Sequence, residues 1–243
     1  MRKKGAERLR SMLTRNHELA AETAADGFPL NHFESLQQWQ LARLTTTFDD
    51  LYRHDGYRRA EEFFVSDLYG GLDFRERDQE MERVMPIMVR FLPDNALVAL
   101  SEAFELQALS IEYDLAMARY MESRGIGDLG MPEYCEVYLA RSDREGRERQ
   151  ISLIRKIGRD LQKLVNKPVI NYLLRMLRGP AHAAGFGKLQ EFLEDGFASF
   201  RALEDADHFV DTIYDREWAA MERLFGGDPD PFRLRGRYSR SVP

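Results

Sequence analysis

The feature that most constrains the fold of this chain is the spacing of its apolar residues. Over most of the 243 residues they recur three and four positions apart, and this period places them on one face of an α-helix. Segments with the strict alternation of β-strands are scarce, and the pair Asp26-Gly27 is followed at once by Phe28-Pro29, as at a helix end. The pattern therefore predicts an all-α protein, a single bundle of about eight to ten helices.

Glycine and proline residues predict where these helices end. A long helix with an apolar stripe from Ile151 to Val165 should kink at Pro168 and stop at Gly179-Pro180. Pro86 should bend or break the helix that contains it. The other helices expected are residues 2–25, 57–68, 73–91, 95–122, 185–203 and 205–225, together with one whose apolar positions run from Phe33 to Leu51 and a short one around Cys135.

The main internal linker is residues 125–132, where three glycines and one proline fall within eight residues. It separates two helical groups, 1–124 and 132–228. Neither group looks able to cover both apolar faces of the 95–122 helix alone, so we expect a single domain that ends at residue 228. The remaining residues, 229–243, form a basic tail that should be loosely ordered, and its removal should leave the fold intact.

Charge is unevenly distributed along the chain. The net charge is −6, with +5 on residues 1–15 and +4 on residues 233–243, which leaves −15 on residues 16–230. An acidic body repels phosphate backbones, so nucleic-acid binding by the folded part is not expected. The two basic ends can serve solubility, or they can contact an anionic surface. The partner is unknown, and it can be a protein or a small polar ligand.

Composition and targeting signals favour the cytoplasm. No apolar run reaches the roughly 18 to 20 residues that cross a bilayer, and the first twenty residues lack the apolar stretch of a signal peptide. Cys135 is the only cysteine, so it cannot form an intramolecular disulfide, and we interpret it as a packing residue.

Sequence motifs give no catalytic residue, no metal ligand set and no cofactor. A diiron bundle needs Glu-x-x-His on two helices, and the chain contains no such tetrad. Its nearest substitute, Asp205-x-x-His208, is better explained as a charge pair at a helix start. Zinc, nucleotide and hydrolase motifs are missing as well, so we lean towards a protein that is not an enzyme.

The candidate binding residues are polar groups on the 95–122 helix, which is apolar on two sides. Glu105 and Glu112 lie seven positions apart, within about 20° on a straight helix, between the two apolar faces. If this helix is central, the carboxylates need partners, and the arginines of residues 75–90 are the expected source. Arg77 and Asp78 of that segment are therefore added to the candidate ligand site. The alternative interpretation is that Glu105 and Glu112 form a solvated stripe or structural ion pairs.

The segment Phe63-Phe64-Val65-Ser66-Asp67-Leu68-Tyr69 resembles the signature of the bacterial FFLEELY-motif proteins. Val65 replaces the leucine of that signature, and Ser66 and Asp67 replace its two glutamates. The similarity extends over most of residues 35–215. It implies a bacterial, cytoplasmic helical protein and transfers no catalytic residue. Physically, the motif should pack Phe63 and Phe64 into the core, and Tyr69 beside Gly70 is a further ligand-binding candidate because its hydroxyl can face a cleft.

Two functions follow as hypotheses. The first is a non-enzymatic helical binding or regulatory protein, because no catalytic constellation is present and basic ends flank an acidic body. The alternative is an enzyme or carrier that binds a metal ion or a small polar ligand at a buried network of carboxylates and arginines.

Overall fold

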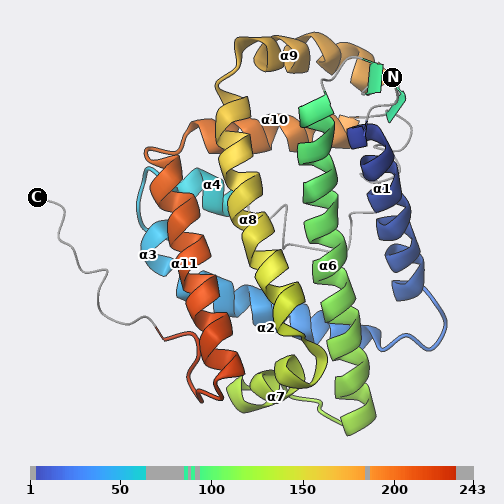
Figure 1. Ribbon diagram of the computed structural model, residues 1–243, viewed down its shortest axis with the longest axis vertical. Helices are drawn as coiled ribbons and strands as arrows, with labels where there is room; N and C mark the ends of the chain where they lie inside the picture. The colour runs from blue at the N-terminus through green and yellow to red at the C-terminus, as the bar shows by residue number, and fades with distance from the viewer. Residues whose placement is uncertain (1–3, 64–84, 87–88, 91–93, 184–186, 234–243) are drawn as a thin grey trace, which may run out of the picture.

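A computed structural model describes residues 4–63, 85–86, 89–90, 94–183 and 187–233 of the chain (Figure 1). These residues contain ten α-helices and no strand, which confirms the predicted all-α bundle. The helices are α1 (Lys4–Thr23), α2 (Leu30–Thr47), α3 (Asp49–Tyr52), α4 (Arg58–Phe63), α6 (Asp94–Arg124), α7 (Met131–Arg141), α8 (Arg144–Val165), α9 (Pro168–Ala183), α10 (Gly187–Arg201) and α11 (Ala206–Phe225).

Four long helices form the body of the bundle, side by side in the order α1, α6, α8 and α11 (Figure 1). The short helix α7 lies at one end of this row, and α9 and α10 lie across the other end. Helix α2 crosses behind the row and contacts α6. Because α6 contacts α1, α2, α7 and α8, it is the central helix of the bundle.

Helix α6 has the two apolar faces that its sequence predicts. Leu97 and Phe104 belong to one core cluster with Leu9 and Leu13 of α1. Met117, on the other side, lies in a second cluster with residues of α2, α7 and α11. Burial of a large apolar side chain contributes about 1.5–3 kcal/mol, so these two clusters explain why a helix of 31 residues lies at the centre of the bundle.

Close approach of α1 and α6 depends on a glycine. The backbone N–H of Gly5 donates to Asp94 Oδ1 at 2.9 Å. A Cβ atom at Gly5 would lie 2.7 Å from the carbonyl oxygen of Asp94. A larger residue would therefore push the two helices apart at this end.

Helix ends agree with the sequence at several positions. Helix α1 ends at Thr23, and the turn that follows contains Gly27, whose φ of +81° lies in the left-handed region that glycine tolerates. Asp205 precedes α11, and its side chain accepts a hydrogen bond from the backbone N–H of His208 at 2.9 Å. The Asp205-x-x-His208 pattern is thus a helix N-cap, in which the carboxylate meets the backbone and not the imidazole.

The predicted end of the long helix is wrong in two details. Helix α8 already ends at Val165, and Pro168 is the first residue of α9 and not a kink within a longer helix. Helix α9 then continues past Gly179-Pro180 to Ala183. Side chains of α10 hold it, because Gln190 Nε2 donates to the carbonyl oxygen of Leu174 at 2.8 Å. This packing outweighs the backbone hydrogen bond that a proline removes.

The glycine-rich linker is a short connection between α6 and α7. Gly125 has a φ of +67°, and the next helix begins at Met131. Helices on both sides of the linker pack against each other, since α7 and α8 contact α6.

The folded body extends beyond residue 228, where the tail was predicted to begin. Pro231 is buried, and the ring centroid of Phe232 lies 5.8 Å from that of Tyr134. Arg233 forms an ion pair with Asp228 at 2.7 Å. Residues 229–233 therefore contribute to packing.

Two predicted helices lie partly outside the described residues. Of the helix expected at 57–68, the structure describes α4. Of the helix expected at 73–91, it describes only residues 85–86 and 89–90, so the bend predicted at Pro86 stays a prediction.

Candidate functional site

Both predicted carboxylates of α6 have arginine partners. Arg149 of α8 donates to Glu105 from Nε and Nη2, at 3.0 and 2.8 Å from Oε1, and Nη2 also lies 3.0 Å from Oε2. Arg8 of α1 approaches the same carboxylate at 2.5 Å. Glu112 accepts from Arg15 Nε at 2.7 Å. These pairs tie α6 to α1 and α8, its two neighbours in the row.

The described partners thus come from α1 and α8, whereas the sequence pointed to residues 75–90. Arg77, Asp78 and Tyr69 lie outside the described residues, and Arg90 is exposed. Side-chain exposure is 21% for Glu105 and 34% for Glu112, so neither carboxylate is fully buried. Their contribution to stability should lie between that of a surface pair and that of a buried one.

The buried carboxylate at this position is Glu102, one turn before Glu105. Its side chain is only 6% exposed, and it pairs with Lys156 of α8 at 2.5 Å and with Arg8 at 3.7 Å. Glu102 was not among the residues predicted from the sequence, although its position carries a signal. Glu102 lies four residues after Val98 and four before Leu106, within the stripe identified as apolar.

A second polar centre lies between α6 and α2. Asp114 is buried, and its Oδ1 accepts a hydrogen bond from Gln40 Nε2 at 3.0 Å. Burial raises the pKa of this carboxyl to about 6, against hydrogen bonds from Gln40 and Gln37 and the attraction of Arg147, which lower it. Within the described part of the chain, no cation lies within ion-pair distance of Asp114. The charged form therefore has amide partners but no direct counter-ion.

Arg147, near Asp114, is a buried guanidinium of α8. It lies 3.9 Å from the ring centroid of Tyr113 and 4.4 Å from that of Tyr138. Its Nε donates to Ser142 Oγ at 2.9 Å and its Nη1 to Gln150 Oε1 at 2.9 Å. Aromatic faces and neutral acceptors thus hold this cation.

The start of α8 is fixed by a tyrosine and an aspartate. The Tyr113 hydroxyl donates to Asp143 Oδ2 at 2.8 Å, and the backbone N–H of Gly146 donates to Asp143 Oδ1 at 2.7 Å. These hydrogen bonds lower the pKa of Asp143. Burial, helped by the bond to Asp143, raises the pKa of Tyr113 to about 12. A Cβ atom on Gly146 would lie 1.8 Å from the Tyr113 hydroxyl oxygen, so this arrangement requires glycine.

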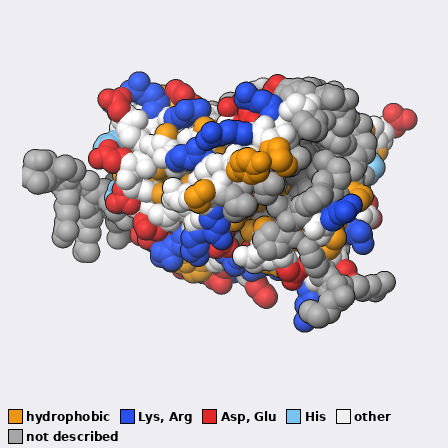
Figure 2. Space-filling view, turned by 90° about the horizontal axis from the view of Figure 1, so that it is seen from above, with side chains coloured by type: hydrophobic (Ala, Val, Ile, Leu, Met, Phe, Trp, Pro, Cys, Tyr) orange, Lys and Arg blue, Asp and Glu red, His pale blue; other side chains and the backbone are white. Residues whose placement is uncertain are grey.

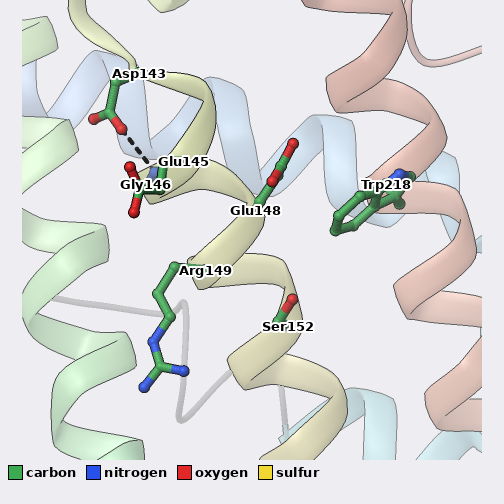
Figure 3. Close-up of a pocket in the computed structure, with 7 residues that line it drawn as sticks. All are labelled: Asp143, Glu145, Gly146, Glu148, Arg149, Ser152 and Trp218. Carbon is green, nitrogen blue, oxygen red and sulfur yellow. Dashed lines mark hydrogen bonds between the residues drawn. The ribbon is translucent and has the colours of Figure 1, made fainter.

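An open pocket of about 530 Å³ lies on the outer side of α8, at its first turns (Figure 3). Trp218 projects from α11 towards α8 at one side of the pocket, while Arg149 extends away from it towards α6. The lining residues are Asp143, Glu145, Gly146, Glu148, Arg149, Ser152 and Trp218. Of the four charged side chains there, three are acidic, and the single arginine is engaged with Glu105.

Aromatic and charged side chains extend this pocket along α11. The rings of Tyr214 and Trp218 lie 5.5 Å apart, and the Arg155 guanidinium lies 4.5 Å from the Tyr214 ring centroid. Glu145 is exposed, and no described cation lies within ion-pair distance of it. A partly exposed indole next to carboxylates suits recognition of a partner more than proton transfer, because tryptophan is a frequent binding hot spot.

The described residues offer no group of three or more histidine, cysteine or carboxylate side chains that could hold a metal ion. His54 stacks on Tyr57 with ring centroids 4.5 Å apart, and burial raises the pKa of the Cys135 thiol. Of the helices in the described ranges, none combines the length and the apolar character that a membrane span requires.

The fold and these sites define an all-α bundle in which ion pairs join the helices and an open acidic pocket lies on the surface. The chain belongs to a family described as a domain of unknown function (DUF8198), whose profile matches residues 20–231. No curated protein and no solved structure matches the chain.

Proposed function

We propose that this protein is a non-enzymatic binding protein and that a partner docks in the open pocket between α8 and α11. The observation that carries the proposal is Trp218, a partly buried indole that faces α8 in a pocket where three of the four charged side chains are acidic (Figure 3). Tryptophan supplies large contact area at low entropic cost, and it is over-represented among residues whose removal weakens binding strongly.

The interior carboxylates are already engaged in ion pairs between helices, which favours binding at the surface pocket. Glu102, Glu105 and Glu112 are each bonded to cations of α1 or α8. A ligand at these carboxylates would have to displace bonds that join helices. Binding at the surface pocket leaves the helix contacts intact.

Comparative affinity purification tests the proposal. Tagged wild-type chain and two variants, Trp218→Ala and Tyr52→Ala, are used as bait in a lysate of the source organism. Tyr52 is an exposed aromatic residue of α3, so its variant controls for the loss of a surface ring. We expect a protein that is recovered with wild type and with Tyr52→Ala but not with Trp218→Ala. Recovery of no protein by wild type, or of the same proteins by all three baits, would refute the proposal.

A carrier for a small polar ligand is the second candidate. The observation that favours it is Asp114, a buried carboxyl whose described partners are amides. Elemental analysis and an absorbance spectrum of the purified protein test this candidate. A stoichiometric metal or chromophore would favour it over the first proposal.

The cellular compartment of the protein and its membership of a narrower family are part of the same proposal. We place the protein in the bacterial cytoplasm and among the FFLEELY-motif proteins. Support for the narrower family comes from position, because the resemblance spans residues 35–215 and the family match spans residues 20–231. Of the heptad, only Phe63 is among the described residues, and its ring lies 5.4 Å from that of Phe192, as expected of a packing residue.

A further inference from the structure

Among the described residues, helix α9 carries the two most exposed large apolar side chains. Tyr172 is 64% exposed and Met176 is 51% exposed. They lie four residues apart, so they neighbour each other on one face of the helix. Two such side chains left in water on adjacent turns are unusual for a soluble surface and indicate a contact site.

The same helix carries two arginines and no carboxylate in a chain that is acidic overall. From residue 161 to residue 190 the sequence has five lysine or arginine residues and no aspartate or glutamate, whereas the whole chain carries −6. Arg175 lies beside Met176 and is exposed, and no described carboxylate lies within ion-pair distance of it. Arg178 pairs with Glu194 of α10, at 3.0 Å from Nε.

The end of the molecule that carries α9 is seen from above in Figure 2. Hydrophobic side chains gather on this surface with lysine and arginine side chains beside them. Helix α9 is held from below by α10, through Gln190 and Glu194. The apolar pair therefore stands on a supported helix and does not depend on a partner to be folded.

We propose that the exposed face of α9, formed by Tyr172, Arg175 and Met176, docks an acidic amphipathic helix of a partner protein. Charge complementarity selects an acidic occupant, because the exposed Arg175 has no described carboxylate within ion-pair distance and α9 itself carries no acid. Tyrosine, methionine and arginine are the residue types enriched in protein interfaces. Two apolar side chains give little area to insert into a bilayer, so a protein helix fits better than a lipid surface. This surface is separate from the α8–α11 pocket.

Fluorescence anisotropy with a labelled synthetic peptide tests the proposal. The probe is a helical peptide of leucine and glutamate with leucines at i, i+3, i+4 and i+7, and a peptide with lysine in place of glutamate controls for charge. We expect the glutamate peptide to bind the full chain and the lysine peptide not to bind. Tyr172→Ala/Met176→Ala should weaken binding at least about tenfold, and Arg175→Glu should weaken it in the same direction.

Matched variants separate this surface from general charge and hydrophobicity. Tyr52→Ala/Leu139→Ala removes two other exposed apolar side chains, and Arg10→Glu makes the same charge change at an exposed arginine of α1. Both should bind the peptide as wild type does, and circular dichroism checks that every variant is folded. Absence of peptide binding, equal loss in the control variants, or binding to vesicles rich in phosphatidylserine in place of the peptide would overturn the proposal.

Discussion

Replacement of Asp114 by asparagine should stabilise the protein at neutral pH and lose this effect in acid. Asp114 is buried against α2 with amide partners, and its pKa is raised from 3.8 to about 6 by burial. The folded protein therefore binds this proton more tightly than the unfolded chain does. Its charged form opposes folding above pH 6, and this penalty disappears as the pH falls towards 4.

The size of the effect follows from the two pKa values. A difference of about 2 between the folded and unfolded pKa corresponds to about 3 kcal/mol at a pH above both. Between pH 4.5 and 7.5 the stability difference between Asp114→Asn and wild type should grow by about 2 kcal/mol, because part of the transition already lies below pH 4.5. Asparagine keeps an oxygen acceptor for Gln40, and the Gln37 amide can rotate to accept from the new NH₂ group.

Urea denaturation followed by circular dichroism measures this difference at half-unit steps of pH. Asp143→Asn is the matched control, because hydrogen bonds from Gly146 and Tyr113 lower the pKa of Asp143. That variant should lose stability at neutral pH and recover in acid, which is the opposite sign. A difference between Asp114→Asn and wild type that stays constant from pH 4.5 to 7.5 would refute the reasoning.

Further predictions concern packing and ion pairs, each measured as a change in unfolding free energy or melting temperature. Glu102→Ala should cost about 3 kcal/mol, Glu105→Ala about 1–2 and Glu112→Ala under about 1, in the order of their burial; equal losses would contradict this order. Gly146→Ala should cost more than about 2 kcal/mol by overpacking, and a neutral result would show that the neighbouring tyrosine moves freely. Phe232→Ala should lower the melting temperature by about 5 °C, so removal of residues 229–243 should destabilise the fold, contrary to the expectation from sequence. Calorimetry should show one transition, and two independent ones would indicate two domains.

The architecture was accessible from the sequence because it depends on local periodicity. Helix α6 was expected at 95–122 and lies at Asp94–Arg124, and its two apolar faces predicted a central position. That position in turn predicted that Glu105 needs a partner. The identity of the partner was not accessible, because Arg8 and Arg149 are 97 and 44 residues away in the chain. Which helices become neighbours is decided by packing of the whole bundle.

Sites at helix borders were harder to predict. Glu102 was missed because the stripe around it was interpreted as wholly apolar, although Lys156 can reach it from α8. Trp218 falls within the apolar pattern of the 205–225 helix, yet it stays partly exposed, whereas Met221 and Leu224 one turn later are buried in the core. An aromatic residue at the border of a stripe looks the same in sequence whether it is covered or left at the surface. Whether such a side chain is buried depends on how closely the neighbouring helix packs against it.

Separation of the binding surfaces from the helix contacts makes the proposed functions testable by mutation. The pairs that join α6 to its neighbours run through Glu102, Glu105 and Glu112. Trp218 takes part in none of these ion pairs, and its ring lies 5.5 Å from that of Tyr214. Tyr172 is largely in water, so its replacement removes little packing. A loss of binding in these variants with unchanged unfolding free energy can therefore be attributed to the surface, whereas the same loss in Glu102→Ala would report on the fold.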